Sequence, residues 1–360
     1  MRRQTHPISV FFCAAITLFC SAYALAANYT AIDLNPSGYY KSSGYGINGG
    51  QQVGKGDPSS ISGSHAMLWT GSSASAIDLN PNGFGNSIAR ATNGSQQVGE
   101  GGGHALLWSG SANNYVDLHP SGYNNSCAYG IYGSWQVGNA TTTDWYSHAM
   151  LWNGSSTRYV DLNPDELVAS NACGIYGTIQ VGNGRGTTTN DKSHALLWHG
   201  SANSYVDLNP SWADDSSCLA VYGTQEVGYG WVYPGYHAFL WNGTAASCID
   251  LNPSGFLSSE ALATNGIQQV GFGGVPTAGG NYHALVWNGS ADNYIDLHPY
   301  LTGQWTQSRA YAIDDMGNVF GYANDSSGIT HAILWQVPEP ASAILIGAGL
   351  LFVRLRRRQN

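Results

Sequence analysis

The side chains best suited to chemistry in this sequence are a histidine and an aspartate that stand thirteen residues apart. The pair His104 and Asp117 recurs ninety residues later within a nearly identical stretch. If each pair belongs to one antiparallel hairpin, with Trp108 opposite Asn113, then His104 lies across from Asp117 on the same face. Such a pair could orient a general base with an acid or supply an imidazole to a metal ion.

The pair is repeated too often to be an active centre. Words of the type His-Ala-x-x-Trp begin at seven histidines, and words of the type Asp-Leu-Asn-Pro or Asp-Leu-His-Pro begin at seven aspartates. We interpret the pairs as structural hydrogen bonds, because a catalytic centre is needed once whereas a closing bond is needed in every unit. No catalytic residue, cofactor or metal site is predicted from them. The pairs are His65 with Asp78, His104 with Asp117, His148 with Asp161, His194 with Asp207, His237 with Asp250, His283 with Asp296, and His331 with Asp33.

The elements that position these pairs form seven copies of one unit. Each unit has an Asp-Leu strand, a variable loop, a strand such as 127–133, a tight turn, a strand ending in Gln-Val-Gly, a second variable loop and a His-Ala strand. Short strands between Gly, Asn and Ser turns, without a helical period, predict four-stranded antiparallel sheets. The chain starts with the Asp strand and ends with the His strand, so the last hairpin is complete only if Asp33 returns beside His331. The sequence therefore predicts an all-β, seven-bladed β-propeller over residues 27–336, with an open solenoid as the alternative.

The two ends of the chain are predicted to be targeting segments. Residues 1–26 combine a basic start, an apolar stretch and small residues before the cleavage point, which is typical of a secretory signal peptide. Residues 337–360 hold an apolar run, Ala341–Val353, and a cluster of four arginines. The run is shorter than the roughly 20 residues of a spanning helix, and the arginines favour a segment held with its positive end in the cytoplasm. An ordinary tail anchor or a weakly held helix is the alternative.

The tail begins with Val-Pro-Glu-Pro at 337–340, continues with the apolar run and ends with the arginine cluster. This order closely resembles the PEP-CTERM sorting signal of Gram-negative bacteria that make extracellular polysaccharide. The resemblance implies an exosortase-type sorting enzyme as a partner, a C-terminal segment that is at least transiently in the inner membrane, and delivery to the cell surface or the extracellular matrix. The body, from about Tyr29 to Trp335, resembles the extracellular HAF-family repeats, although only 237–239 spells His-Ala-Phe. The sorting motif consists of Val337, Pro338, Glu339 and Pro340.

Charge excludes some classes of partner. The sequence has 13 basic and 22 acidic residues, but six of the arginines and Glu339 lie in the two ends, so the body carries a net charge of about −14. Without a basic cluster, a nucleic acid partner is not expected. The cysteines of the body stand in different registers of the repeat, which favours buried free thiols over the disulfides that an oxidising compartment permits. These cysteines are Cys127, Cys173, Cys218 and Cys248.

Function is expected where the copies differ. The loops after the Asp-Leu and Gln-Val-Gly words vary, and in an up-and-down blade both emerge on the same side of the disc. Aromatic rings beside small polar residues suit carbohydrate, because a ring can cover the apolar face of a sugar. Packing of the rings on the disc is the alternative for each of them. The candidate ligand-binding residues are Tyr123, Trp145, Tyr146, Trp212, Trp231, Tyr233, Tyr282 and Trp305.

The sequence is interpreted as an exported binding or structural propeller, with extracellular polysaccharide as its candidate ligand, and it is not expected to be an enzyme. The rival class is a secreted polysaccharide lyase or hydrolase that uses unrepeated acidic residues. No two of these acids stand at a sequence spacing that marks a glycosidase pair. The adjacent Asp214 and Asp215 offer too few oxygens for a calcium ion. The candidate acids of the rival class are Asp144, Glu166, Asp191 and Asp214.

Overall fold

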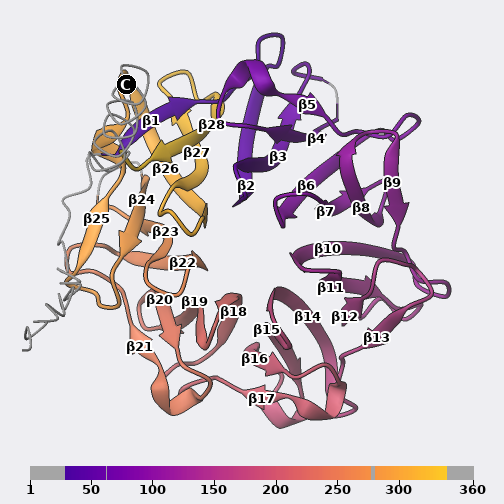
Figure 1. Ribbon diagram of the computed structural model, residues 1–360. Coiled ribbons are helices and arrows are strands. Elements are labelled where there is room, and N and C mark those ends of the chain that lie inside the picture. The colour runs from indigo at the N-terminus through magenta and orange to yellow at the C-terminus, as the bar shows by residue number, and fades with distance from the viewer. Residues whose placement is uncertain (1–28, 62, 277–279, 339–360) are drawn as a thin grey trace, which may run out of the picture.

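Seven four-stranded antiparallel sheets stand as blades around a common centre (Figure 1), where residues of the inner strands line a channel. The structure, a computed structural model, describes residues 29–61, 63–276 and 280–338. The predicted signal peptide, residues 1–26, and residues 339–360 of the sorting segment lie outside the described residues. The predicted all-β, seven-bladed propeller is confirmed, and the open solenoid is wrong.

Each blade has an inner strand beside the channel, a second and a third strand, and a short outer strand. The inner strands are β2 (Lys41–Asn48), β6 (Ser87–Thr92), β10 (Asn125–Tyr132), β14 (Leu167–Tyr176), β18 (Ser216–Tyr222), β22 (Ser258–Thr264) and β26 (Trp305–Ile313). The second strands are β3 (Gln51–Asp57), β7 (Gln97–Gly101), β11 (Trp135–Thr141), β15 (Ile179–Gly186), β19 (Gln225–Val232), β23 (Gln269–Gly274) and β27 (Val319–Asp325).

The third strands carry the His-Ala words, and the outer strands carry the aspartates. The third strands are β4 (His65–Trp69), β8 (His104–Ser111), β12 (Ser147–Trp152), β16 (His194–Trp198), β20 (Gly235–Trp241), β24 (Tyr282–Trp287) and β28 (Thr330–Gln336). The outer strands are β5 (Ile77–Asp78), β9 (Asn114–Asp117), β13 (Tyr159–Asp161), β17 (Val206–Asp207), β21 (Ile249–Asp250), β25 (Tyr294–Asp296) and β1 (Thr30–Asp33). Five single-turn 3-10 helices are η1 (Ser73–Ser75), η2 (Thr187–Thr189), η3 (Ala202–Ser204), η4 (Ala245–Ser247) and η5 (His298–Tyr300). Within the described ranges, no helix has the length and apolar character needed to cross a membrane.

The two ends of the propeller meet in one blade. Strand β1 pairs antiparallel with β28, with Ala31 opposite Trp335, and the two strands lie side by side in Figure 1. The Nδ1 atom of His331 lies 2.7 Å from Oδ2 of Asp33. The first strand therefore completes the sheet β1-β28-β27-β26, as the split hairpin predicts, and the ring is closed by pairing of the chain ends.

The core lies between neighbouring blades, because the third strand is buried on both of its faces. In β8 the residues from Ala105 to Trp108 are at most 4 % exposed. Leu68 and Leu79 of one blade pack with Leu106 and Trp108 of the next. The tryptophan that ends each His-Ala word is at most 1 % exposed, so these rings are packing residues, as expected.

A buried serine also joins each blade to the next. The backbone N–H of Ala149 donates to Oγ of Ser170 at 3.0 Å, and that hydroxyl donates to Oδ1 of Asn163 at 2.7 Å. The N–H of Asn163 in turn donates to Oδ1 of Asp161 at 2.8 Å. These bonds satisfy an amide that would otherwise be buried without a partner, and they connect the third strand of one blade to the inner strand of the next. The equivalent serines are Ser42, Ser87, Ser126, Ser170, Ser216, Ser259 and Ser308.

Every inner strand has a β-bulge at the same place, which the sequence analysis missed. In β10, Ala128 lies opposite Gly138 and Gly130 lies opposite Val137, so Tyr129 is the extra residue. A bulge changes the direction of a side chain, and all seven bulge residues line a channel cavity of about 220 Å³. The bulge residues are Tyr45, Arg90, Tyr129, Cys173, Leu219, Leu262 and Tyr311.

Candidate functional site

All seven histidine and aspartate pairs are in contact, with Nδ1 between 2.6 and 2.8 Å from Oδ2. The predicted register, with Trp108 opposite Asn113, is wrong by two residues, because the hairpin extends further before it turns. Asp117 lies opposite Leu106 and reaches His104 diagonally. A shift of two residues keeps the side chains on the same face, so the contact survives.

The second oxygen of each aspartate is also engaged. Oδ1 of Asp161 accepts the N–H of Asn163, while Oδ2 accepts from His148 and from Oη of Tyr123. Burial acts to raise the pKa of Asp161, but the hydrogen bonds from His148 and Asn163 outweigh it, so the pKa is lowered. Within the described part of the chain, no three His, Cys, Asp or Glu residues are placed to hold a metal ion. This geometry agrees with a structural hydrogen bond, and that role stays a prediction.

The lowered pKa predicts acid sensitivity at the Asp161 position. The folded state holds the carboxylate ionised below the ordinary aspartate pKa of about 3.9. The stabilisation is therefore present above that pH and is lost as the pH falls through the lowered pKa. We expect Asp161→Asn to flatten this part of the curve of unfolding free energy against pH, measured by urea denaturation. Asp144→Asn, at an exposed loop position, is the control and should leave the curve unchanged.

The connections between strands define two faces of the disc. The chain enters each inner strand from the face that carries the loops after the Asp-Leu and Gln-Val-Gly words, which we name the variable face. The inner-to-second and third-to-outer turns lie on the opposite side, the uniform face. Each blade therefore places two variable loops on one face and two turns on the other, except that the two ends of the propeller replace one turn of the seventh blade.

The eight aromatic candidates all lie toward the variable face, but the structure does not gather them into one site. Trp145 and Tyr233 are 74 % and 89 % exposed, and Trp212 and Tyr146 are about half exposed. The remaining rings are tied to the disc or packed on one another. Tyr123 donates to Asp161, Tyr282 lies against the guanidinium of Arg309, Trp305 donates to the carbonyl of Thr302, and Trp231 meets Tyr236 edge to face.

One cleft brings together a candidate ligand-binding aromatic residue and two of the candidate catalytic acids. It lies on the variable face between the fourth and fifth blades and has a volume of about 560 Å³. Two of the four candidate acids, Asp191 and Asp214, line it together with the candidate aromatic Trp231; Asp144 and Glu166 do not line it. The remaining lining residues are Lys192, Ser193, Asp215 and Tyr236.

Backbone hydrogen bonds join segment 214–215 to Trp231 on the fifth-blade side of this cleft, and an ion pair joins that side to the fourth blade. The N–H of Asp214 donates to the carbonyl of Trp231, and the N–H of Trp231 donates to the carbonyl of Asp215, both at 3.0 Å. Nζ of Lys192 lies 3.2 Å from Oδ1 of Asp214. Burial raises the pKa of the Asp215 carboxyl, and the charge of Asp214 raises it further. The cleft thus presents one carboxylate paired with a lysine beside a second carboxyl that keeps its proton more readily.

Strained backbone is concentrated in the variable loops. Among the described residues, the non-glycine residues with positive φ are Trp145, Asn190 and Asp191, at 67°, 52° and 58°. Asn and Asp tolerate this conformation, but a bulky residue such as Trp145 does so at a cost. The side chain of Trp145 is mostly exposed, so little packing repays that cost. A strained, exposed ring is a reason to look for a ligand there.

Removing this ring is expected to stabilise the fold. Trp145→Gly should raise the free energy of unfolding by about 1 kcal/mol, because glycine adopts a positive φ without steric cost. The measurement is urea denaturation of both proteins. Trp212→Gly is the control, since Trp212 has no positive φ and packs edge to face on Phe239, 4.9 Å between ring centroids. The Trp212→Gly variant should lose stability. If Trp145→Gly also loses stability, the backbone at Trp145 does not destabilise the fold.

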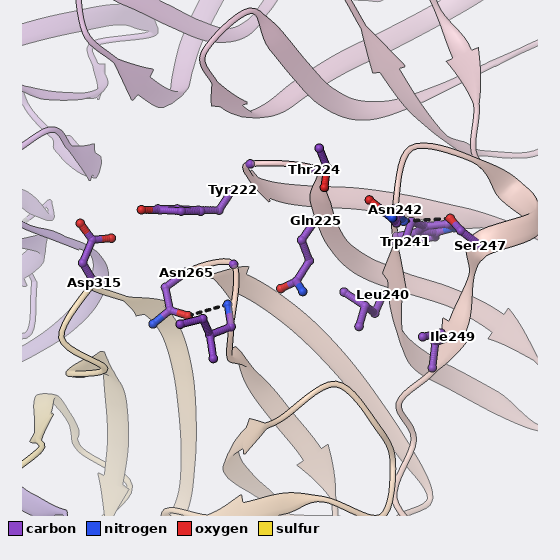
Figure 2. A pocket seen from close by; sticks show the side chains of 13 residues that line it. Tyr222, Thr224, Gln225, Leu240, Trp241, Asn242, Ser247, Ile249, Asn265 and Asp315 are labelled. Carbon is purple, nitrogen blue, oxygen red and sulfur yellow. Dashed lines mark hydrogen bonds between the residues drawn. The ribbon is translucent and has the colours of Figure 1, made fainter. Parts of the chain in front are cut away.

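A second hollow lies on the uniform face between the fifth and sixth blades, and the sequence analysis missed it. Its volume is about 620 Å³. Figure 2 shows the side chains of Gln225 and Asn265 projecting into it, with Leu240 and Ile249 along one side and Asp315 beyond the ring of Tyr222. The inner-to-second hairpins of the fifth and sixth blades have equal lengths, so only residue types could have revealed it. Gln225 stands where the third and fourth blades have Trp135 and Ile179.

The four cysteines of the body are free, as expected. Cys127 and Cys218 are buried, and Cys173 and Cys248 are half-buried. Burial raises the pKa of Cys127 and of Cys173 to about 12. These thiols are therefore protonated and poorly nucleophilic at neutral pH.

The last strand continues directly into the predicted sorting segment, where Val337 and Pro338 follow β28. Residues 336–358 match the PEP-CTERM protein-sorting motif. The chain carries this sorting motif, which is the recognition signal of exosortase-type enzymes and implies an exported surface protein. The match does not extend to the body, so the resemblance to HAF-family repeats stays a prediction. No curated protein matches the sequence.

Solved structures share the fold at very low sequence identity. An oligogalacturonate lyase from Vibrio parahaemolyticus is 12 % identical with a TM-score of 0.55, covering 86 % of this chain and 92 % of that one. A puromycin hydrolase is 10 % identical with a TM-score of 0.55, covering 84 % and 55 %. The β-propeller domain of the Trilobed protease from Pyrococcus furiosus is 8 % identical with a TM-score of 0.53, covering 84 % and 97 %. This chain spans about half the length of the hydrolase.

These structures overturn the prediction that the protein is not an enzyme. A hydrolase and a lyase share its architecture, so a propeller without a nucleophile motif in its sequence is compatible with catalysis. At such low identity, the likenesses show the fold alone. Any activity must therefore be argued from the side chains of this chain.

Proposed function

We propose that this exported protein binds a polysaccharide through its variable face, with the cleft between the fourth and fifth blades as the main site. The observation that supports this most is the meeting of two aromatic rings with three carboxyl groups and a lysine in one open cleft. Trp231 or Tyr236 can cover the apolar face of a sugar ring, while Asp191, Asp214 and Lys192 meet its hydroxyl groups.

The charge of the variable face narrows the class of sugar. The body carries about −14, and Asp191, Asp214 and Asp215 line the cleft with only Lys192 to oppose them. An acidic polysaccharide would be repelled by this surface, whereas a neutral or amino sugar would not. We therefore propose a neutral or amino-sugar polymer as the ligand.

A second candidate function is hydrolysis of the same polymer. The observation that favours it is the difference between two adjacent carboxyl groups. Asp214 is paired with Lys192, whereas the pKa of Asp215 is raised by burial and by the neighbouring Asp214 charge. Two carboxyls whose environments set their pKa values apart can act as acid and base in glycosidic cleavage when they flank the scissile bond. Asp215 would donate the proton, and Asp214 would act as the ionised partner.

The test uses the body, residues 27–336, on an array of neutral, amino and uronic oligosaccharides. Trp231→Ala should weaken binding about ten-fold or more, equivalent to about 1.4 kcal/mol. Trp135→Ala, at a ring 39 % exposed on the uniform face, is the matched control and should bind normally. Equal binding by both variants would contradict the proposal that this cleft binds the polysaccharide. Release of reducing ends, abolished in Asp215→Asn, would support the second candidate.

Binding is also expected to depend on pH through Asp215. Its raised pKa means that the carboxyl gains a proton at a higher pH than an ordinary aspartate, whose pKa is about 3.9. We expect affinity to fall as the pH is lowered through this raised value, because a protonated carboxyl is a weaker acceptor for sugar hydroxyls. Titration calorimetry across the range measures it. In Asp215→Asn the affinity should be low but flat, and a retained slope would assign the effect to another group.

A further inference from the structure

Both ends of the propeller leave the disc at the uniform face, beside one turn of the seventh blade. Oη of Tyr29 donates to the carbonyl of Gly317 at 3.3 Å, and the N–H of Val337 donates to Oδ1 of Asn318 at 3.0 Å. The carboxylate of Asp314 accepts the N–H and the side-chain amide of Asn318, so the turn is braced from within. The point at which the sorting segment leaves the disc is therefore fixed.

The distance from this exit to the apolar run is short. Pro338 is the last described residue, and the run begins at Ala341. Three extended residues span at most about 10 Å. Strand β28, whose seven residues cross the disc from the variable to the uniform face, is about twice as long at roughly 3.3 Å per residue. If the apolar run enters a membrane, the uniform face or the edge of the seventh blade must lie at the lipid surface, and the variable face cannot.

The distribution of charge also favours the uniform face as the one that lies at the lipid surface. The variable-face loops carry six acidic residues and one basic residue, and the aspartates of the seven pairs stand at their base. The uniform-face turns carry one basic and three acidic residues, and one of these acids, Asp314, is buried. A surface with few charges meets a lipid headgroup layer at lower cost than an acidic one. The charged residues of the uniform-face turns are Arg158, Asp292, Asp314 and Asp315.

The uniform face also exposes apolar and aromatic side chains. Ile267 and Met316 are 78 % and 72 % exposed, and Tyr132 and Trp135 are about 40 % exposed. Such residues are favoured in the interfacial layer of a membrane. Ile267 also lines the hollow of Figure 2, together with Ile249, which is 45 % exposed.

We propose that the uniform face is a lipid-docking surface, which lies against the membrane while the sorting segment is attached and holds the variable face away from it. This proposal takes the sorting segment to be in the membrane, as the sorting motif implies. The polysaccharide cleft then points outward before the protein is sorted. An edge-on disc, resting only on the seventh blade, is the arrangement that the test must separate from this one.

The experiment uses residues 27–360 in vesicles of phosphatidylethanolamine and phosphatidylglycerol that contain a lipid-borne fluorescence quencher. Single labelled cysteines are placed on opposite faces of the same blade, in a background without the four native cysteines. In the third blade they are Ser134→Cys on the uniform face and Thr143→Cys on the variable face. In the seventh blade they are Met316→Cys on the uniform face and Ser327→Cys on the variable face. We expect strong quenching at both uniform-face sites and little at the other two.

Each other result would overturn the proposal. Quenching at Met316→Cys alone means an edge-on disc, and quenching at Thr143→Cys or Ser327→Cys means the wrong face. If the chain does not float with the vesicles, the expected membrane attachment of the sorting segment fails as well, whereas flotation with the wrong face quenched defeats this proposal alone. Residues 27–336 are the control and should not float.

A second measurement needs no cysteine replacement. Hydroxyl-radical footprinting of the unaltered chain, followed by mass spectrometry, reports the exposure of aromatic and aliphatic side chains. Vesicle binding should reduce oxidation of Trp135 and Ile267 on the uniform face and leave Trp145 and Tyr233 on the variable face unchanged. Unchanged oxidation of Trp135 and Ile267 in vesicle-bound protein would overturn the proposal.

Discussion

Gly138→Ala is expected to lower the free energy of unfolding by about 3 kcal/mol or more, although it adds a single methyl group. A Cβ atom at this position would fall on the carbonyl oxygen of Cys127 in the adjacent strand. The bulge at Tyr129 brings this carbonyl close, and a backbone atom cannot move aside as a side chain can. The same overlap exists at every glycine that ends a Gln-Val-Gly word, namely Gly54, Gly99, Gly138, Gly182 and Gly271, and at Gly228 and Gly321 in the variants Glu-Val-Gly and Val-Phe-Gly.

The matched control is Gly85→Ala. Gly85 lies in a variable-face loop, its φ is not positive, and no atom lies within 4 Å of the position that its Cβ would take. This substitution should change stability by no more than about 0.5 kcal/mol. Urea denaturation of both variants with the parent protein gives the comparison. Similar losses for the two would mean that the repeated glycine is not required by the neighbouring carbonyl.

The ring could be predicted because its evidence is local and repeated. The interval of thirteen residues between histidine and aspartate is constant in six copies, which marks one hairpin of fixed length. The seventh copy is divided between Asp33 and His331, and only a closed circle brings these two together. Burial of the His-Ala strand on both faces was evident from its unbroken apolar residues, since such a strand needs cover on each side.

The channel and the exact register could not be predicted, because both depend on small backbone irregularities. A bulge adds one residue to one strand, and nothing in the Ser-x-Ala-x-Gly pattern around Tyr129 or Cys173 distinguishes it from plain alternation. The longer hairpin that places Asp117 opposite Leu106 has the same composition as a shorter one. The bulge position and the hairpin register depend on how two strands pair, and the sequence of one strand does not determine that pairing.

The cleft could be predicted only in its parts. The sequence indicated Asp191, Asp214 and Trp231 for separate reasons, as unrepeated acids and as an aromatic of a variable loop. Their meeting depends on two loops of adjacent blades and on the hydrogen bonds between 214–215 and Trp231. Asp215 becomes a candidate only in the structure, where burial raises its pKa. Contacts between loops of neighbouring blades follow from the closed ring and not from sequence spacing.

Leu34→Ala is expected to lower the free energy of unfolding by about 3 kcal/mol and to open the seam first. Leu34 is fully buried, and its N–H donates to the carbonyl of Ala332 at 2.8 Å. It packs with Trp69, Phe320 and Leu334, which belong to the first and seventh blades. In the other six blades a turn joins the outer strand to the third strand, but β1 is held to β28 by noncovalent contacts alone. Local opening at such a strand costs less than global unfolding.

Leu79→Ala separates the seam from the general cost of a cavity. Leu79 is equally buried, and its N–H makes the equivalent bond to Ala66 at 2.8 Å, but its outer strand is joined to the third strand by the chain. Both variants should lose similar stability by urea denaturation. In native-state hydrogen exchange, the amides of β28 should exchange faster than the remaining core in Leu34→Ala only. Exchange that rises uniformly in both variants would mean that the seam is as strong as any other hairpin. Because β28 leads directly into the sorting motif, early opening of the seam would also release the fixed exit of that segment from the uniform face.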